Sequence, residues 1–312
     1  MRFAFTDEQL AFRDAARDLL ARECPPSYVR SAWTGDGVDA RKVWFALAEM
    51  GVLGALLEAS AVDVILVIEE TGYAAVPEPV VEHAMVGVPL LPDIIDGQHT
   101  ITASDDPKCV VPFADRADRF LLLVDKRLVL VGQQGVVALD NLESVDGARR
   151  SAIVDYSRVE TQFSERETTQ AFDRGALGTA AQLIGLTRRM LDMTVEYVKE
   201  RQQFGVPIGS FQAVKHHLAD ARIALEFARP LVYRAAWTMS EGDPDASVHV
   251  SMAKAMAGNA ALLTARKALQ CHGAIGYSYE YDLHLFMKRA WALAAAWGDA
   301  AFHRASVGRA IL

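Results

Sequence analysis

Apolar residues at alternating intervals of four and three positions constrain the fold of this chain more than any other feature. The pattern holds without interruption at Val214, Leu218, Ala221, Leu225, Ala228, Val232 and Ala235. Because that spacing places every member on one face of an α-helix, it predicts a long helix with one continuous packing surface. Similar spacing runs from Leu177 to Val198, and residues 246–270 are rich in alanine and apolar on more than one side. With a last helix from about Asp282, these segments predict a four-helix bundle.

The first ninety-odd residues predict a separate helical domain. One helix opens at Thr6, and further helices are expected over residues 39–50, 62–68 and 78–91. Thr6 and Gln9 form a capping-box pattern, and the run Cys24-Pro25-Pro26 ends the first helix. The apolar run 62–68 is short enough for a strand, but the surrounding helices and a C-cap at Gly72 favour a helix.

The residues between Gly97 and Glu165 differ in composition from the helical segments and predict a small β-domain. Short runs rich in Val, Leu and Phe predict strands over residues 108–113, 119–124, 127–131, 136–139 and 151–156. Polar residues predict turns at 105–107, 125–126 and 140–141.

The expected fold is therefore α+β and mostly α. It has a helical domain over residues 1–96, a shortened β-domain over 97–165 and a four-helix bundle over 166–312. Within the bundle, Pro230 should kink its helix or begin a new one.

Composition excludes several classes of protein. The 312 residues include 32 basic and 40 acidic side chains, a net charge of −8, and no long Lys/Arg run, so nucleic-acid binding is not expected. Three separated cysteines, Cys24, Cys109 and Cys271, indicate a reducing compartment without disulfides. The absence of an apolar signal core or a membrane-length apolar run predicts a cytoplasmic protein. Adjacent His216 and His217 point apart on a helix, and no metal site is expected.

The run Arg201-Gln202-Gln203-Phe204-Gly205 carries the most chemistry. By itself Arg201 suits the negative end of a helix, and Phe204-Gly205 is an ordinary helix stop. A guanidinium also offers paired donors to phosphate oxygens, and an aromatic ring can stack on a nucleotide base. The combination with Gln212 and with residues 270–277 favours a nucleotide site, although no phosphate-binding glycine loop is present.

These segments resemble the acyl-CoA dehydrogenase family. The similarity is specific over residues 197–205, 208–212 and 270–280, and it extends to 44–57 and 69–72. It implies the same three-part fold and FAD bound across a subunit interface. In that arrangement Arg201 and Phe204 reach the pyrophosphate and adenine of a neighbouring subunit's FAD. Beside the same FAD lie Gln212, Gln270, Gly273 and Gly276.

The departures from the family pattern concern the other half of the site. The β-domain segments that hold the flavin ring are missing, and only Thr100, Thr102 and Ser104 remain as weak candidates. The family places its glutamate base at positions that correspond here to Trp297 or Gly175. Asp299 is the best substitute, but a solvated or capping aspartate is the preferred interpretation, so no catalytic base is expected.

Three hypotheses follow from this resemblance. The leading one is a subunit of an α2β2 acyl-CoA dehydrogenase, like the short, base-lacking subunit of actinobacterial heterotetramers that act on steroid side chains. A full-length partner would supply the base and flavin pocket, and an electron-transfer flavoprotein would accept the electrons. The second is a self-sufficient homo-oligomer with Asp299 or Glu280 as a relocated base. The third is a flavin-free structural paralogue.

Overall fold

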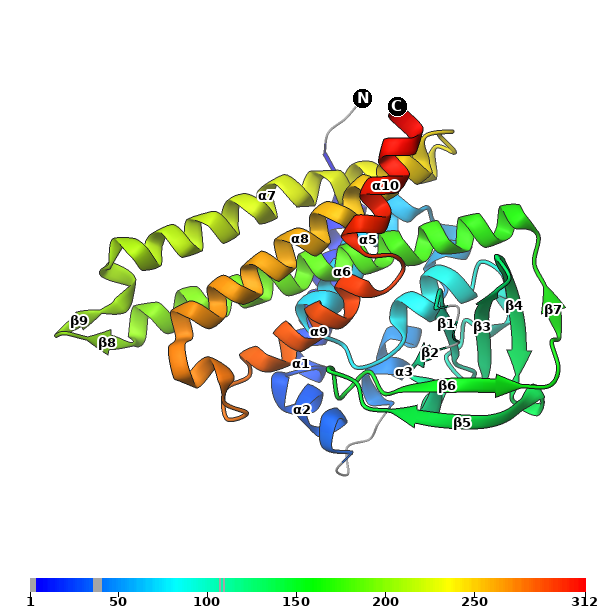
Figure 1. Ribbon diagram of the computed structural model, residues 1–312, viewed down its shortest axis with the longest axis horizontal. Coiled ribbons are helices and arrows are strands. Elements are labelled where there is room, and N and C mark those ends of the chain that lie inside the picture. The colour runs from blue at the N-terminus through cyan, green and yellow to red at the C-terminus, as the bar shows by residue number, and fades with distance from the viewer. Residues whose placement is uncertain (1–3, 36–40, 107, 109) are drawn as a thin grey trace.

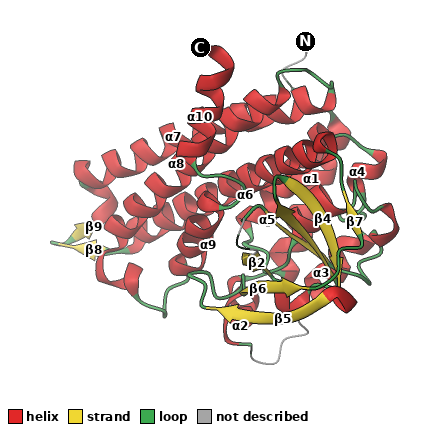
Figure 2. Ribbon diagram, turned by 45° about the vertical axis from the view of Figure 1, so that its right-hand side comes forward, coloured by secondary structure: helices red, strands yellow, loops and turns green. Residues whose placement is uncertain are grey.

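The computed structural model describes residues 4–35, 41–106, 108 and 110–312. A long helical bundle forms one side of the molecule, and the N-terminal helices and two small sheets pack against it (Figure 1). The sheets lie near one end of the long helix α6 (Glu165–Glu200), and a small β-hairpin projects from the opposite end (Figures 1 and 2). The α+β, mostly helical fold that the sequence predicted is confirmed.

The N-terminal part is helical up to residue 94. Its elements are α1 (Asp7–Glu23), α2 (Pro26–Thr34), α3 (Lys42–Glu49), α4 (Ala55–Glu58), α5 (Ala61–Tyr73), the π-helix η1 (Val81–Gly87) and the 3-10 helix η2 (Pro92–Ile94). The capping box of Thr6 and Gln9 is present, and the helix over 62–68 is confirmed. The start of the helix expected over 39–50 lies outside the described residues. Of the helix expected over 78–91, the part Val81–Gly87 is helical, with π geometry, and α2 and α4 were not anticipated.

The prediction that Gly72 caps a helix is wrong. Gly72 lies inside α5, whose C-cap is Ala74. A Cβ atom built on Gly72 would lie 2.7 Å from the carbonyl carbon of Gln182 on α6. The glycine is needed because the backbones of α5 and α6 touch there, and no larger residue leaves enough space.

Two small sheets form the β-region. One contains, in spatial order, β1 (Ile101–Ser104), β3 (Arg119–Val124), β4 (Arg127–Gly132) and β7 (Thr161–Gln162), and the other contains β2 (Val110–Pro112), β6 (Ser151–Tyr156) and β5 (Val136–Leu142). Positive φ angles of 47° at Asp125 and 65° at Lys126 confirm the tight turn between β3 and β4. The turn expected at Asp140-Asn141 is wrong, because both residues pair with β6 inside β5. The strands β1 and β7 were not predicted.

The bundle follows from residue 165 onward. After α6 come α7 (Gln212–Ser240), α8 (Ala246–His272), α9 (Leu283–Ala295) and α10 (Ala300–Ile311). Most of the seam predicted on α7 is buried, at Ala221, Leu225, Ala228, Val232 and Ala235. The helix continues through Pro230 without ending there. The single last helix that the sequence suggested is divided into α9 and α10 by a turn at Trp297 and Gly298, and this turn shapes the interior site described below.

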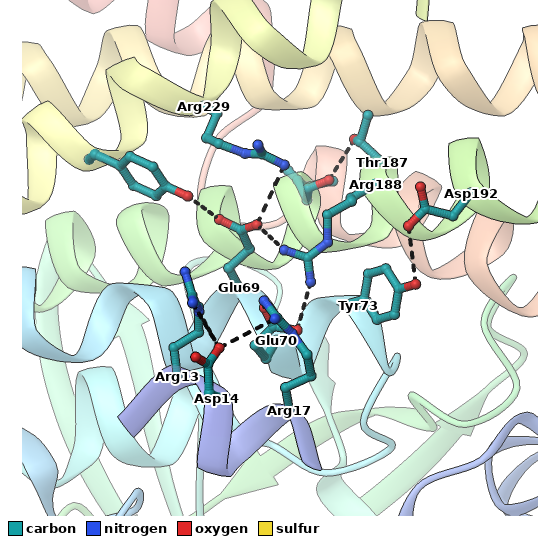
Figure 3. A network of polar contacts seen from close by, with 12 residues as sticks. Arg13, Asp14, Arg17, Glu69, Glu70, Tyr73, Thr187, Arg188, Asp192 and Arg229 are labelled. Carbon is teal, nitrogen blue, oxygen red and sulfur yellow. Dashed lines mark hydrogen bonds and ion pairs between the residues drawn. The ribbon is translucent and has the colours of Figure 1, made fainter. Parts of the chain in front are cut away.

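A buried polar network fixes the N-terminal helices to the bundle (Figure 3). Arg188 of α6 donates from Nη1 to Glu69 and from Nη2 to Glu70, each over 2.6 Å. Both glutamates belong to α5. Arg17 of α1 adds an ion pair of 2.9 Å to Glu70, and the hydroxyl of Tyr233 on α7 donates to Glu69 over 2.7 Å. Because the two carboxylates are buried and each has several partners, the network sets the register of four helices.

Candidate functional site

The predicted nucleotide residues begin at a β-hairpin that extends from the end of the bundle. Arg201 is the C-cap residue of α6, and the hairpin strands β8 (Gln202–Gln203) and β9 (Val206–Pro207) follow it directly. The hairpin turn consists of Phe204 and Gly205, with φ angles of 54° and 82°. These residues are therefore not an ordinary helix stop, because the chain pairs with itself before the 3-10 turn η5 (Ile208–Ser210) leads into α7.

Backbone pairing between β8 and β9 forms this hairpin, and the side chains of residues 201–207 are exposed. Arg201 is exposed, and no described acidic side chain lies within 4.0 Å of its guanidinium. Phe204 is 92% exposed at the tip of the hairpin. Its ring makes a T-shaped contact with the Phe211 ring, with the two centroids 6.2 Å apart. Gln212 is the exposed first residue of α7. A cation and an apolar ring thus remain available for a group that this chain does not itself supply.

The second predicted segment lies at the same end of the bundle (Figure 1). Gln270 is exposed in the last turn of α8, and Gly273 ends that helix with a φ of 63° before the 3-10 turn η6 (Gly273–Tyr277). A Cβ atom on Gly273 would meet nothing within 4 Å, so the backbone there is open to approach. Gly276 is buried instead, where a Cβ atom would lie 2.9 Å from Leu269.

A ring stack that sequence reasoning missed joins the two segments. The Tyr197 and His272 rings are stacked with centroids 4.3 Å apart and planes inclined by 20°. Burial lowers the pKa of His272, and its Nδ1 donates to the carbonyl oxygen of Ala268 over 2.8 Å. Tyr197 lies one helical turn before Arg201, and His272 directly precedes Gly273. The neutral stack therefore holds the two predicted segments in a fixed relative position.

The two positions expected for a catalytic base also meet, in the interior of the protein. Gly175 lies on α6, and the indole ring of Trp297 lies against it. A Cβ atom on Gly175 would be 2.5 Å and 2.7 Å from ring atoms Cε2 and Cε3 of Trp297. The indole is 2% exposed and makes an edge contact with Phe172 at 6.0 Å. An aromatic ring therefore fills the space between the two positions at which the family resemblance placed a base.

The backbone of Trp297 is held in an unusual conformation by buried polar groups. Its φ of 54° lies in the left-handed region, which costs about 1–3 kcal/mol for such a residue. The two carboxylate oxygens of Asp105 accept from the backbone N–H groups of Trp297 and Gly298, each over 3.0 Å. Burial raises the pKa of Asp105, and these two donors oppose that effect.

Two further side chains complete this support. Lys254 of α8 donates to the carbonyl oxygens of Ala294 and Gly298 over 3.2 Å and 2.9 Å, and burial lowers its pKa to about 7. His303 of α10 lies with Nε2 2.8 Å from the carbonyl oxygen of Trp297, and burial lowers its pKa to about 4. A carbonyl only accepts, so His303 carries its proton on Nε2. The turn is thus fixed from several elements at once.

The remaining candidates have structural roles. Asp299 is the N-cap of α10 and accepts from the backbone N–H of Phe302 over 2.8 Å, as the capping interpretation expects. The hydroxyls of Thr102 and Ser104 are buried and donate to backbone carbonyls of β2 over 2.6 Å. Thr100 accepts from Arg41 over 2.8 Å, and Glu280 is exposed. Asp299, Thr102 and Ser104 are thus occupied by backbone contacts, whereas Glu280 lines an open surface pocket together with Arg30 and Asp282.

Sequence reasoning missed Asp105, Lys254 and His303. Asp105 was assigned only to a turn, and His303 stands in no recognisable motif. Lys254 did carry a signal, because it is a cation in the middle of an alanine-rich helix that is apolar on more than one side. In the described part of the chain no group of three or more His, Cys, Asp and Glu side chains could hold a metal ion. Cys24 and Cys271 are free and buried, whereas Cys109 lies outside the described residues.

Comparison with known families gives two matches. Residues 6–92 match the family described as acyl-CoA dehydrogenase, N-terminal domain, and residues 166–312 match acyl-CoA dehydrogenase, C-terminal domain. The segment between them, which contains both sheets, lies outside these two matches.

No helix within the described ranges has both the length and the apolar character needed to cross a membrane.

Similar proteins extend over nearly the whole chain. Acyl-CoA dehydrogenase IpdE2 of Mycolicibacterium smegmatis is 30% identical over 302 residues, which cover 91% of this chain and 93% of the relative. IpdE2 of Mycobacterium tuberculosis is 29% identical over 304 residues, covering 91% of each chain. Among solved structures, a chain of the ChsE4-ChsE5 complex from Mycobacterium tuberculosis superimposes with a TM-score of 0.86 at 22% identity, covering 99% of this chain and 98% of the other. A chain from a Tcur3481-Tcur3483 steroid ACAD variant gives the same TM-score of 0.86 and identity of 22%, with 98% of each chain covered.

Proposed function

The chain belongs to the acyl-CoA dehydrogenase family, and from this premise we propose that it is one subunit of an FAD-dependent enzyme whose catalytic subunit is a different chain. Its share of the reaction is to bind part of the partner's FAD. The partner supplies the carboxylate base and the pocket for the flavin ring. FAD, when bound, would accept the hydride that leaves the β-carbon of the acyl-CoA.

One observation carries this proposal: Arg201 and Phe204 are held at fixed backbone positions and have almost nothing to contact within their own chain. A guanidinium without an acidic partner suits a pyrophosphate, because its parallel N–H groups match phosphate oxygens. An exposed ring beside it suits adenine. The residues present at the end of the bundle therefore fit the diphosphate and base of FAD.

The neighbouring residues would complete that half of the site. Gln212 and Gln270 are exposed amides that can donate or accept at the ribose and phosphate oxygens. The open backbone at Gly273 permits close approach of a ligand, and the turn at Gly276 packs that backbone onto the end of α8. The stack of Tyr197 on His272 would keep these groups at a constant separation from Arg201.

The interior of the chain supports an unlike partner over a second copy of this chain. An identical partner would bring the same Trp297 against Gly175 and no carboxylate at either position. The ChsE4-ChsE5 structure is by its title a complex of two proteins, and the Tcur3481-Tcur3483 protein is by its title a steroid ACAD. We extend these features to this chain as an α2β2 assembly that acts on a bulky, steroid-like acyl-CoA in the cytoplasm. An electron-transfer flavoprotein is the proposed acceptor.

The experiment that tests the proposal is a flavin count on purified proteins. The chain is produced alone and together with a full-length acyl-CoA dehydrogenase encoded beside it, and the visible spectrum and subunit ratio are measured. We expect no flavin on the chain alone and about one FAD for each pair of unlike chains. Turnover of an acyl-CoA by the chain alone would contradict the proposal and favour a homo-oligomer. A stable but colourless complex would favour a structural paralogue.

A further inference from the structure

The contact between Gly175 and Trp297 makes the two residues mutually dependent. The distances of 2.5 Å and 2.7 Å from an added Cβ to the indole are shorter than real Cβ contacts, and the ring atoms involved are the rigid fused part of the side chain. No side chain at position 175 can therefore coexist with the ring in its present place. A glutamate at Gly175 would first require Trp297 to leave.

The ring is not free to leave at low cost, because its backbone is fixed on both sides. Asp105 bridges two consecutive N–H groups, and Lys254 and His303 hold the carbonyl oxygens of Gly298 and Trp297. His303 is itself held, with Nδ1 3.1 Å from the hydroxyl of Ser251. These contacts hold Trp297 at its left-handed φ of 54°.

We infer that Trp297 is a permanent plug: its indole occupies a preformed, ring-sized space against Gly175. Under the proposed function, in which positions 175 and 297 border the acyl-CoA site, the ring closes that site in this chain. The closed site is thus a built feature and not merely the loss of a carboxylate. The last consequence rests on the proposed function, namely that the assembly offers one acyl-CoA site for each pair of unlike chains. The claim about the ring itself depends on this chain alone.

Removal of the plug tests whether the space is preformed. The Trp297→Gly variant of the full chain suits the positive φ and leaves a cavity, so we expect a lower melting temperature that indole restores in large part by saturable binding. The matched control is Trp291→Ala on the neighbouring helix α9, where Trp291 is half exposed and no closed cavity forms. Indole should not stabilise that control. A folded Trp297→Gly chain that does not bind indole would overturn the inference.

A second test does not rely on a cavity. Gly175→Ala should destabilise the chain because its methyl group displaces the ring, and the same change should cost less in the Trp297→Gly background, where the ring is absent. If Trp297 instead swings out easily, Gly175→Ala will leave the melting temperature unchanged, which would contradict a fixed plug.

A measurement on the unmodified chain remains informative even if these variants fold poorly. With 5-fluorotryptophan incorporated, the ¹⁹F signal of Trp297, assigned from Trp297→Phe, should be single and protected from a soluble paramagnetic agent. The signals of half-exposed Trp237 and Trp291 should broaden. An accessible or doubled Trp297 signal would overturn the inference. None of these measurements involves flavin, so their failure is distinguishable from failure of the flavin count.

Discussion

The hairpin at the end of the bundle and the interior turn at Trp297 differ in how many contacts their residues make within the chain. Both regions hold a bulky residue at a left-handed φ of 54°, Phe204 in the hairpin and Trp297 in the interior turn. Arg201 and Phe204 are exposed with almost no partners, whereas the backbone N–H and carbonyl groups of Trp297 are hydrogen-bonded to Asp105 and His303. The hairpin side chains make few contacts within the chain, whereas the groups at the interior turn are already bonded to other residues of the chain.

This difference teaches where a ligand can act. A group that is already hydrogen-bonded and buried has to break those contacts before it can bind anything else. An exposed cation and ring have no such contacts to lose, so that binding costs only the ordering of their side chains. This contrast is what the proposed function draws on, with the hairpin as half of a cofactor site and an unlike partner as the catalytic subunit.

The largest expected effect compares the two aromatic residues through stability. Trp297→Ala should lower the free energy of unfolding by about 3–5 kcal/mol, because it empties a buried ring site. Phe204→Ala should change it by less than about 0.5 kcal/mol, because the ring is 92% exposed. Urea denaturation of both variants, followed by circular dichroism, measures the difference. Similar losses of stability in both variants would mean that the Phe204 ring is packed against other residues and not exposed.

The next effect should appear only in cofactor binding. Arg201→Ala in the assembled complex should weaken FAD by about 1.5–3 kcal/mol, or roughly tenfold to a hundredfold, because a charge-assisted contact is lost. Subunit assembly should be unchanged. Lys199→Ala is the matched control, since Lys199 is an exposed cation two residues away that pairs with Glu196 over 2.7 Å. Flavin fluorescence titration measures both, and equal losses would contradict a specific role for Arg201.

The contrast also explains how much could be predicted from the sequence. The seam along α7 was predictable because apolar periodicity reports burial directly. The strands at 119–124 and 151–156 were predictable from short runs rich in Val, Leu and Phe. The run 201–205 stood out as a candidate nucleotide motif because its residues are contiguous. The support of Trp297 was not, since Asp105 and His303 come from distant segments and meet only in the folded chain. Gly72 was misread for the same reason, because the helix that requires it lies more than a hundred residues away.

The interior turn should also give the stability of the chain a dependence on pH. Burial lowers the pKa of Lys254 to about 7 from its ordinary value of 10.5, so between these values the folded chain holds a neutral amine and the unfolded chain a charged one. The unfolded state then binds more protons, and stability should rise with pH, by at most about 1.4 kcal/mol per unit. The contribution is complete above pH 10.5 and is lost as the pH falls through 7.

Lys254→Met tests this dependence, because it keeps the length of the side chain and removes the titrating group. Urea midpoints of the natural chain and the variant should be compared between pH 7 and 10. The natural chain should show the steeper rise. Parallel curves would mean that Lys254 stays charged in the folded protein, paired with Asp105. No comparable dependence is expected from the hairpin, so Arg201→Met should leave the curve unchanged.

The smallest expected effect is that of the hairpin ring on cofactor affinity. Phe204→Ala should weaken FAD in the complex by about 0.5–1.5 kcal/mol, or roughly twofold to tenfold, because a stacking partner of the adenine is removed. Phe204→Trp keeps an aromatic face and should retain the affinity, whereas Phe204→Leu keeps only the apolar character and should not. If leucine binds FAD as well as phenylalanine does, the ring acts by covering apolar surface and not by stacking. The open end would then remain a cofactor site with Arg201 as its main contact.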